Sequence, residues 1–416
     1  MTDGANLGDA VWLKGGALAR LIALLDCDGE EARVVGGAVR NALMRLPVGE
    51  VDVATSARPE EVMRRIEAAG GKAVPTGIGH GTITAVIDGH AFEVTTLRED
   101  VETFGRKARV AFGRDWSRDA KRRDFTINAL SATRDGKVFD YVGGLADIAA
   151  HRVRFIGEPR RRIEEDYLRI LRFFRFQAHF GKGPPDAAGL LACIRERAGL
   201  ETLSRERVRM ELLKLVVAPR ATPALAVMLE SGILGMVLGG VPFIASFENM
   251  VKVEAALGVE PDALRRLGAL GVWVIEDTER LGERLRLANA ESERLAALDL
   301  WWRMTPAADG QPVRALLYRL GPQAFRDRTL LAWARSQAGA ADGAWRHLAM
   351  FPQHWSAPVF PLKAADFIAR GVAAGPPLGA ALRAAEEAWI AADFPADRAA
   401  LDAIARKAQL EAVSGA

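Results

Sequence analysis

Val34-Val35-Gly36-Gly37-Ala38-Val39-Arg40 is followed ten residues later by Glu50-Val51-Asp52. The spacing predicts a short strand that enters a Gly-Gly turn, a helix of one or two turns, and a returning strand. Residues two apart on a strand point to the same face, so we expect Glu50 and Asp52 to lie side by side near the turn. Two carboxylates beside a phosphate-sized turn suit a Mg²⁺-dependent phosphoryl or nucleotidyl transferase. A solvated strand end after a turn is an equally good interpretation of this segment alone.

The size and composition of the chain limit its class. With 416 residues and a mean hydropathy of +0.03, it is an ordinary globular chain that is too long for one core. Cys27 and Cys193 lie far apart with no Cys-x-x-Cys pattern, which excludes a disulfide framework or a zinc ribbon and predicts a cytoplasmic protein. The longest uncharged stretch, 231–247, is interrupted by glycines and a proline, so no membrane association is expected.

Two segments, 98–123 and 152–175, are rich in arginine. Forked guanidinium groups suit contacts to phosphates and base edges, whereas a solvated surface is the usual explanation of such a run. Their position on both sides of a candidate metal site favours an anionic partner. The basic residues are Arg98, Arg106, Lys107, Arg109, Arg114, Arg118, Lys121, Arg122 and Arg123, then Arg152, Arg154, Arg160, Arg161, Arg162, Arg169, Arg172 and Arg175.

The chain changes character near residue 160. Before it, strand patterns alternate with helix patterns, and an Asp88-Gly89 hairpin turn joins two of the strands. Beyond it only helical patterns continue, with seven tryptophans assigned to core packing. The sequence therefore predicts an α+β protein with a mixed-sheet head (1–150) and an all-helical neck (151–215), body (216–340) and tail (341–416). The expected strands are 33–35, 51–54, 82–87 and 91–95, the expected helices 38–45 and 59–69, and the tryptophans Trp273, Trp301, Trp302, Trp333, Trp345, Trp355 and Trp389.

A second polar motif occupies 122–130. Its apolar residues can anchor the segment while Arg123, Asp124 and Asn128 remain polar, with the last two on one helical face at i and i+4. A guanidinium, a carboxylate and an amide grouped in this way can hold ribose hydroxyls and a triphosphate. The alternative is that Asp124 caps a helix and Arg122 is solvated.

The pattern of a third motif, 164–176, predicts a single helix. Ile163, Tyr167, Ile170, Leu171 and Phe174 form its predicted buried stripe. Another face carries a ladder of polar residues in steps of three, which is either a surface salt-bridge ladder or a binding face. Three arginines against one aspartate leave the ladder unbalanced and suggest an absent anionic partner. The ladder consists of Asp166, Arg169, Arg172 and Arg175.

In this order and spacing, the motifs resemble the class II nucleotidyltransferases, which comprise CCA-adding tRNA nucleotidyltransferases and bacterial poly(A) polymerases. The resemblance is dense from about residue 33 to 180 and continues weakly through 204–211. It implies a nucleotidyltransferase-type mixed sheet in the head. The segments that carry it are Gly36-Gly37-Ala38-Val39-Arg40, Phe92-Glu93-Val94-Thr95-Thr96-Leu97-Arg98, Gly143-Gly144-Leu145-Ala146-Asp147, 122–129 and 165–176.

The resemblance also implies a role for each matching residue. Glu50 and Asp52 would hold Mg²⁺, with Glu93 as a further catalytic carboxylate. The 206–211 segment would brace the neck, and the tail would bind tRNA. The nucleotide-binding residues would be Gly36, Gly37 and Arg40 at the phosphates, Arg122, Arg123, Asp124 and Asn128 at the ribose and triphosphate, Asp166 and Arg169 at the base, and Arg172 and Arg175 in support.

Base choice follows from hydrogen-bonding chemistry. Adenine and cytosine each present an amine donor beside a ring-nitrogen acceptor, whereas guanine and uracil present a carbonyl beside an N–H donor. Arg169 donates only and an ionised Asp166 accepts only, so this pair matches ATP and CTP and rejects the other two triphosphates. One protein surface can therefore select A and C without a nucleic-acid template.

Two positions depart from the family pattern. Glu50 stands where the first metal carboxylate is usually Asp, and Asn41 follows Arg40 where Asp is common. A glutamate carries one more methylene, and near-octahedral Mg²⁺ is demanding about geometry. The main hypothesis is a CCA-adding enzyme that uses CTP, ATP and the 3′ end of tRNA. A poly(A) polymerase and a non-catalytic RNA-binding member are the alternatives.

Overall fold

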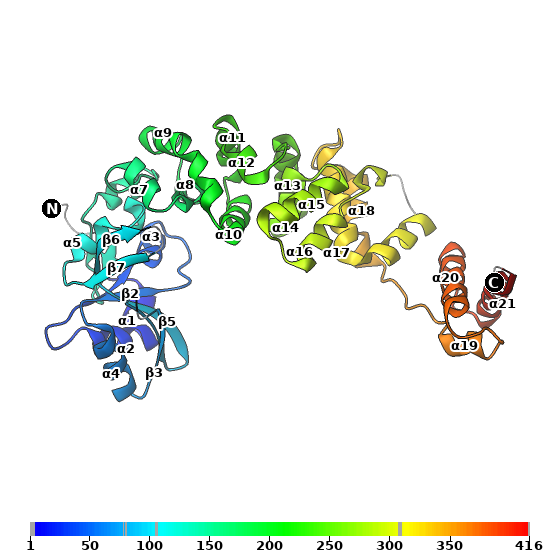
Figure 1. The fold of residues 1–416 in the computed structure, drawn as a ribbon, viewed down its shortest axis with the longest axis horizontal. Helices are drawn as coiled ribbons and strands as arrows, with labels where there is room; N and C mark the ends of the chain where they lie inside the picture. The colour runs from blue at the N-terminus through cyan, green and yellow to red at the C-terminus, as the bar shows by residue number, and fades with distance from the viewer. Residues whose placement is uncertain (1–4, 78, 80, 105–106, 307–309, 415–416) are drawn as a thin grey trace. The chain divides into compact units, whose positions relative to one another are not determined.

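The computed structural model describes residues 5–77, 79, 81–104, 107–306 and 310–414, and its side chains exclude 99–111 and 413–414. The predicted basic residues Arg106, Lys107 and Arg109 thus fall outside the described side chains. The chain divides into two compact units, Met1–Val237 and Leu238–Ala416 (Figure 1). The boundary lies inside the segment predicted to be a helical body, and the division into head, neck, body and tail stays a prediction.

A seven-stranded mixed sheet, in the order β3-β4-β5-β2-β1-β8-β9, is the centre of the first unit, and β6-β7 form a separate ribbon. β2 and β5 pair in parallel, and β1 pairs antiparallel with β2 and β8. The four predicted strands are confirmed as β1, β2, β4 and β5, and Asp88-Gly89 joins the last two with positive φ at both residues. The strands are β1 (Ala32–Val35), β2 (Asp52–Thr55), β3 (Lys72–Gly77), β4 (Thr82–Ile87), β5 (His90–Thr96), β6 (Arg98–Phe104), β7 (Lys107–Phe112), β8 (Ser131–Ala132) and β9 (Val138–Phe139).

Amphipathic helices pack on this sheet. Leu21 and Ile66 are fully buried in one core with the strand residues Val34 and Val53. Both predicted helices are confirmed as α3 and α4, and Gly70, with φ +80°, follows the end of α4. The helices of this part are α1 (Val11–Lys14), α2 (Gly16–Leu25), α3 (Gly37–Leu43), α4 (Pro59–Ala68), α5 (Trp116–Lys121), η2 (Thr126–Asn128) and α6 (Gly144–Ala149).

The described chain is helical after β9, as predicted, but the expected single helix through 164–176 is wrong. The backbone is extended at Asp166 (φ −159°), between α7 and α8. The Asp166 carboxylate accepts a hydrogen bond from the backbone N–H of Leu168 (3.2 Å), and such a local bond competes with helix continuation. The helices from here to the unit boundary are α7 (Pro159–Glu165), α8 (Leu168–Phe180), α9 (Ala187–Arg195), η3 (Arg197–Thr202), α10 (Arg205–Val216), α11 (Ala221–Glu230) and α12 (Ile233–Leu238).

The second unit continues with helices, and α17 is kinked at Gly321 before Pro322. Trp333, Trp345 and Trp389 are buried as predicted, but core packing is wrong for Trp273 and Trp302, which are 42% and 49% exposed. Within the described residues, no helix has the length and apolar character that crossing a membrane requires. The helices are α13 (Ile244–Leu257), α14 (Ala263–Gly271), α15 (Ile275–Leu285), α16 (Asn289–Ala296), η4 (Trp301–Arg303), α17 (Gln311–Arg335), α18 (Gly343–His354), α19 (Ala364–Ile368), α20 (Pro376–Ala391) and α21 (Arg398–Ser414).

Candidate active site

Three carboxylates gather where β2 begins. Asp52 is the first residue of β2 and is paired in parallel register with Glu93 on β5. Glu50 lies in a bend two residues before the strand rather than on it. Burial and the charge of Glu50 raise the pKa of Asp52 against the opposing charge of Arg123. Burial and the charges of Asp52 and Glu50 raise the pKa of Glu93. The structure therefore brings the three predicted carboxylates within electrostatic reach of one another.

These carboxylates suit a hard divalent cation. Within the described part of the chain, none of the three takes part in a hydrogen bond or ion pair, so their repulsion is relieved only partly by Arg123. No three His, Cys, Asp or Glu side chains among the described residues form a ready-made metal-ligand group. Mg²⁺ is typically held by one or two carboxylates with substrate phosphates and water, so the donor set fits such an ion without a complete protein cage.

The Gly36-Gly37 turn faces two guanidinium groups. Gly36 has φ +69°, and a Cβ placed there would lie 3.2 Å from Nη1 of Arg123. A Cβ on Gly37 would lie 3.6 Å from Nη2 of Arg40. Both glycines thus keep the backbone close to positive charge, and Gly36 also supplies a conformation that other residues rarely adopt.

Arg40 is buried beside this turn. Its Nη1 donates to Oδ1 of Asn128, and its Nε and Nη2 donate to Oδ1 of Asn41. Its guanidinium lies 3.9 Å from the centre of the Phe180 ring, a cation–π contact. Burial, followed by the charge of Arg175, lowers the pKa of Arg40 to about 10, which leaves it protonated at neutral pH.

Asp119 pairs with the two arginines at the end of α5. Arg122 Nη2 lies 2.6 Å and Arg123 Nη2 3.3 Å from the Asp119 carboxylate, which is buried. The alternative of a solvated Arg122 is therefore wrong. Sequence analysis did not single out Asp119, although its i, i+3 and i, i+4 spacing to the two arginines on a helix was a usable signal.

Asp124 and Asn128 lie side by side, as expected, but on a 3₁₀ turn and its approach rather than on an α-helix. Asn128 Nδ2 donates to Asp124 Oδ1 (3.2 Å), and Arg172 Nη2 donates to Asp124 Oδ2 (2.6 Å). Burial opposes ionisation of Asp124, but the charge and hydrogen bonds of Arg172 and the bond from Asn128 lower its pKa overall. A chain of hydrogen bonds thus links Arg40 to α8.

The predicted arginine ladder has partners on other elements. Glu211 on α10 accepts from Arg175 (2.6 Å) and lies 3.5 Å from Arg172. Arg169 pairs with Glu165. These arginines thus have carboxylate partners within the chain, and a further anionic partner for them stays a prediction. Glu211 lies in the 206–211 segment, and its contacts to α8 are consistent with the bracing expected of that segment.

The two predicted base-reading residues do not pair with each other through their side chains. Asp166 accepts two hydrogen bonds from Arg207 on α10 (3.1 and 2.6 Å). The backbone N–H of Arg169 donates to the Asp166 carbonyl (3.0 Å), so the two residues occupy one turn at the start of α8. Sequence analysis missed Arg207, because 41 residues separate it from its partner and no periodicity connects them.

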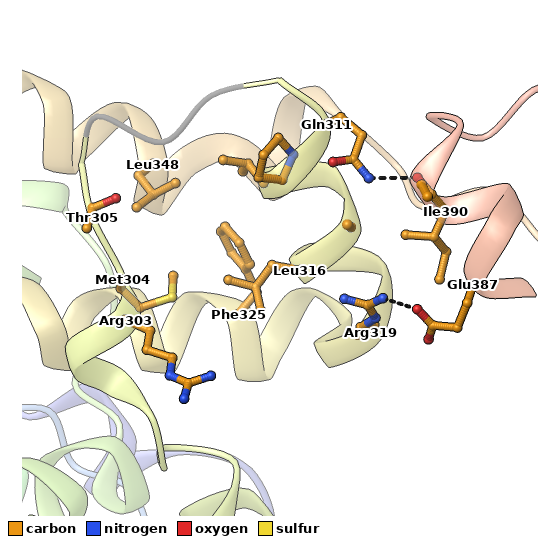
Figure 2. A pocket seen from close by; sticks show the side chains of 14 residues that line it. Arg303, Met304, Thr305, Gln311, Leu316, Arg319, Phe325, Leu348, Glu387 and Ile390 are labelled. Atoms are coloured by element: carbon orange, nitrogen blue, oxygen red, sulfur yellow. Dashed lines mark hydrogen bonds and ion pairs between the residues drawn. The ribbon is translucent and has the colours of Figure 1, made fainter.

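The second unit contains a cavity of about 450 Å³. Figure 2 shows Met304, Phe325 and Leu348 around it, and Gln311 Nε2 donating to the carbonyl of Ile390 (2.7 Å). None of the residues predicted to bind nucleotide or metal lines this cavity. The group of carboxylates, arginines and amides in the first unit is therefore the candidate active site.

Comparisons with known proteins find similar proteins over most of the chain. Residues 32–154 match the poly A polymerase head domain, and residues 190–247 match the probable RNA and SrmB-binding site of polymerase A. Over 379 residues, the chain is 34% identical to CCA tRNA nucleotidyltransferase 1, mitochondrial, of Mus musculus, covering 89% of this chain and 86% of that protein. It is 30% identical over 378 residues to the CCA-adding enzyme of Limosilactobacillus fermentum, covering 87% and 89%. The solved Bacillus stearothermophilus CCA-adding enzyme in complex with CTP superposes with a TM-score of 0.75 at 28% identity, covering 95% of this chain and 98% of that one.

Proposed function

Because this chain belongs to the class II nucleotidyltransferase family that contains the CCA-adding enzymes, we propose that it adds CMP, CMP and AMP from CTP and ATP to the 3′ end of tRNA. It is a nucleotidyltransferase that processes tRNA. The observation that supports this function most directly is that carboxylates gather where β2 begins, close to guanidinium groups at the Gly36-Gly37 turn.

Nucleotidyl transfer of this kind depends on a metal ion, which we propose to be Mg²⁺ held by Glu50 and Asp52, with Glu93 in support. When bound, Mg²⁺ supplies the positive charge that lowers the pKa of the attacking 3′-hydroxyl and neutralises the triphosphate. The protein contributes oxygen ligands whose mutual repulsion favours a cation over an empty site.

The arginines hold the triphosphate in this proposal. Arg40 and Arg123 line the glycine turn, and guanidinium groups match phosphate oxygens in a forked geometry. Arg122 supports them, because it shares the Asp119 carboxylate with Arg123. Asp124 and Asn128 offer an acceptor and an amide to the ribose hydroxyls. Such a site acts mainly by orienting the α-phosphate toward the RNA hydroxyl.

Base choice is assigned to Asp166 and Arg169, with Arg207 holding the Asp166 carboxylate. Two hydrogen bonds from one guanidinium fix the plane of that carboxylate. Arg172 and Arg175 stabilise the start of the neck through Asp124 and Glu211. A fixed acceptor and a donor on one turn then select adenine and cytosine without a template.

The remaining parts of the proposal concern the rest of the chain. The helical tail (341–416) is assigned to tRNA binding, and the neck (151–215) to base recognition. Cys27 and Cys193 are free thiols, as in a reducing cytoplasm, which is the compartment that we propose.

The test is incubation with tRNA that lacks its 3′ end, in the presence of Mg²⁺ and each labelled triphosphate in turn or ATP and CTP together. We expect a product longer by three nucleotides that requires both triphosphates. A long run of adenylate from ATP alone would make the protein a poly(A) polymerase, and no product with any triphosphate would contradict an enzymatic function.

A further inference from the structure

Arg40 is a buried cation whose described side-chain hydrogen bonds are all to neutral groups. The residue is 8% exposed. It donates to Asn41 Oδ1 from Nε (3.1 Å) and Nη2 (2.8 Å), and to Asn128 Oδ1 from Nη1. The rings of Phe176 and Phe180 cover it. The neighbouring carboxylate of Asp124 is bonded to Arg172 instead.

The other end of the Asn41 amide contacts a different part of the site. Asn41 Nδ2 donates to the carbonyl of Pro47 (3.0 Å), and the backbone N–H of Leu46 donates to the Asn41 carbonyl (2.8 Å). Pro47 begins the short loop that leads to Glu50. One side chain therefore joins the guanidinium at the glycine turn to the loop that carries the first carboxylate.

Only a primary amide can make both contacts at this position. An aspartate would accept from Arg40 but would neutralise it, and it would place a second acceptor against the Pro47 carbonyl. We propose that Asn41 is a positioning residue that holds Arg40 in place without neutralising it and fastens the Pro47–Glu50 loop. This inference rests on the proposed function, because it assigns the uncompensated charge of Arg40 to the polyphosphate of the incoming nucleotide.

The electrostatic consequence follows from the cost of burying charge. A buried guanidinium with only amide and aromatic partners has given up water without gaining an ion pair. The charge of Asp124 favours the protonated form of Arg40, but that carboxylate is bonded to Arg172. Arg175 adds like charge nearby. A triphosphate that binds at the glycine turn supplies the missing anion, so Arg40 contributes more to nucleotide affinity than an arginine already paired with a carboxylate would.

The experiment compares Asn41→Asp, Asn41→Ala and the wild type by calorimetric titration with inorganic pyrophosphate and with CTP. In Asn41→Asp we expect affinity for both to fall roughly tenfold, and KM for CTP to rise more than kcat falls. Asn41→Ala keeps the charge of Arg40 available and loses affinity only about two- to threefold. The control, Asn289→Asp, adds the same charge at an exposed position in α16 and is expected to leave pyrophosphate affinity unchanged.

A merely structural role for Asn41 predicts the opposite order of affinities for the two variants. Aspartate has the same shape and accepts more strongly from Arg40, so Asn41→Asp would resemble the wild type and Asn41→Ala would be the weaker binder. That order would overturn the proposal.

The loop contact gives a second readout. Both variants lose the bond to Pro47, so we expect each to need several-fold more Mg²⁺ for half-maximal turnover. If Asn41→Asp does not fold, the Mg²⁺ requirement of Asn41→Ala still tests the proposal. An unchanged Mg²⁺ requirement in that variant would overturn it. Pyrophosphate binding needs no tRNA, so a wild type that fails to extend tRNA would refute the proposed function while leaving the role of Asn41 to be decided.

Discussion

Each unit contains a network of arginines and carboxylates, and the two networks differ in balance. In the second unit, Arg265, Arg266 and Arg294 face Glu254, Asp262 and Asp327, and Glu254 and Asp327 are only 1% exposed. In the first unit, four of five arginines share three carboxylates, and the fifth, Arg40, donates only to amide groups. The arginines are Arg40, Arg122, Arg123, Arg172 and Arg175, and the carboxylates are Asp119, Asp124 and Glu211.

The difference separates a structural network from a binding site. Three charges of each sign can satisfy one another completely, and removal of one partner leaves an unpaired buried charge. An excess of guanidinium groups cannot be satisfied internally, and in the first unit it lies beside the glycine turn and the carboxylates of Asp52 and Glu93. Substitutions in the first unit should therefore change function more than stability, and those in the second unit should do the reverse.

The largest effect is expected from Asp52→Ala. Loss of a metal carboxylate should lower nucleotide incorporation by roughly 10³-fold or more, since several kcal/mol of transition-state stabilisation are lost. The melting temperature should change little, because Asp52 is destabilised by burial and by Glu50. Glu50→Asp should keep or raise activity if Glu50 is simply a longer ligand.

The control for this measurement is Glu67→Ala, an exposed carboxylate on α4, which should retain wild-type incorporation. Full activity of Asp52→Ala, or turnover that does not need Mg²⁺, would contradict the metal-site assignment. It would also contradict the proposed difference between the two networks.

The second prediction concerns Glu254→Gln in the balanced network. Glu254 accepts from Arg265 (2.7 Å) and Arg266 (2.6 Å), so loss of its charge should destabilise the protein by about 3–5 kcal/mol. Affinity of the folded protein for CTP should be unchanged. Urea unfolding and calorimetric CTP titration measure the two quantities separately.

Glu387→Gln is the matched control, because its partner Arg319 and Glu387 itself are both about half exposed or more. Such a surface pair is worth about 0–1 kcal/mol. Equal losses of stability in the two variants would show that burial does not determine how much an ion pair contributes to the free energy of unfolding.

The sequence predicted the head of this protein well, because local patterns determine it. Hydrophobic runs, the Asp88-Gly89 turn and the Gly36-Gly37 turn each act over a few residues, and all correspond to observed elements. The residues of the site motifs lie close together in the structure, and their binding roles stay predictions. Helical periodicity, however, predicted that 164–176 forms one helix, and a hydrogen bond from the Leu168 N–H to the Asp166 carboxylate accompanies the break.

The partners of the motif residues could not be predicted in the same way. Glu211 and Asp124 contact α8, and Arg207 contacts Asp166 just before it, from segments 36 to 48 residues away in sequence. Neither periodicity nor composition encodes such pairings. For the same reason the arginine ladder looked unpaired. Asn41 was visible as a departure from the family pattern, but its contacts to Arg40 and Pro47 required the structure.

The third prediction tests base choice, which the proposed function assigns to Asp166 and Arg169. Asp166→Ala removes an acceptor for the exocyclic amine, so preference for ATP and CTP over GTP and UTP should fall roughly 5- to 150-fold while metal-dependent chemistry survives. Arg207→Met should shift selectivity in the same direction by less, because Asp166 remains but loses its two hydrogen bonds. Single-nucleotide incorporation with all four triphosphates measures this, and unchanged selectivity in both variants would place the template elsewhere.

The smallest effect should be a pH-dependent stability difference at Asp124, the carboxylate that links the head to α8. Its pKa in the folded protein lies below the unfolded value of about 3.9, since Arg172 and Asn128 bind the ionised form. A depressed pKa contributes stability above the unfolded value, and that contribution is lost as pH falls through the folded pKa. Asp124→Asn should therefore be less stable than wild type by roughly 1–2 kcal/mol at pH 7, with the gap closing below about pH 4. In an Arg172→Met background most of the pH-dependent gap should disappear, because the cation that favours the carboxylate is gone. A gap that is constant from pH 7 to pH 3 would mean that Asp124 contributes by shape and neutral hydrogen bonding, and that the head–neck link does not depend on charge.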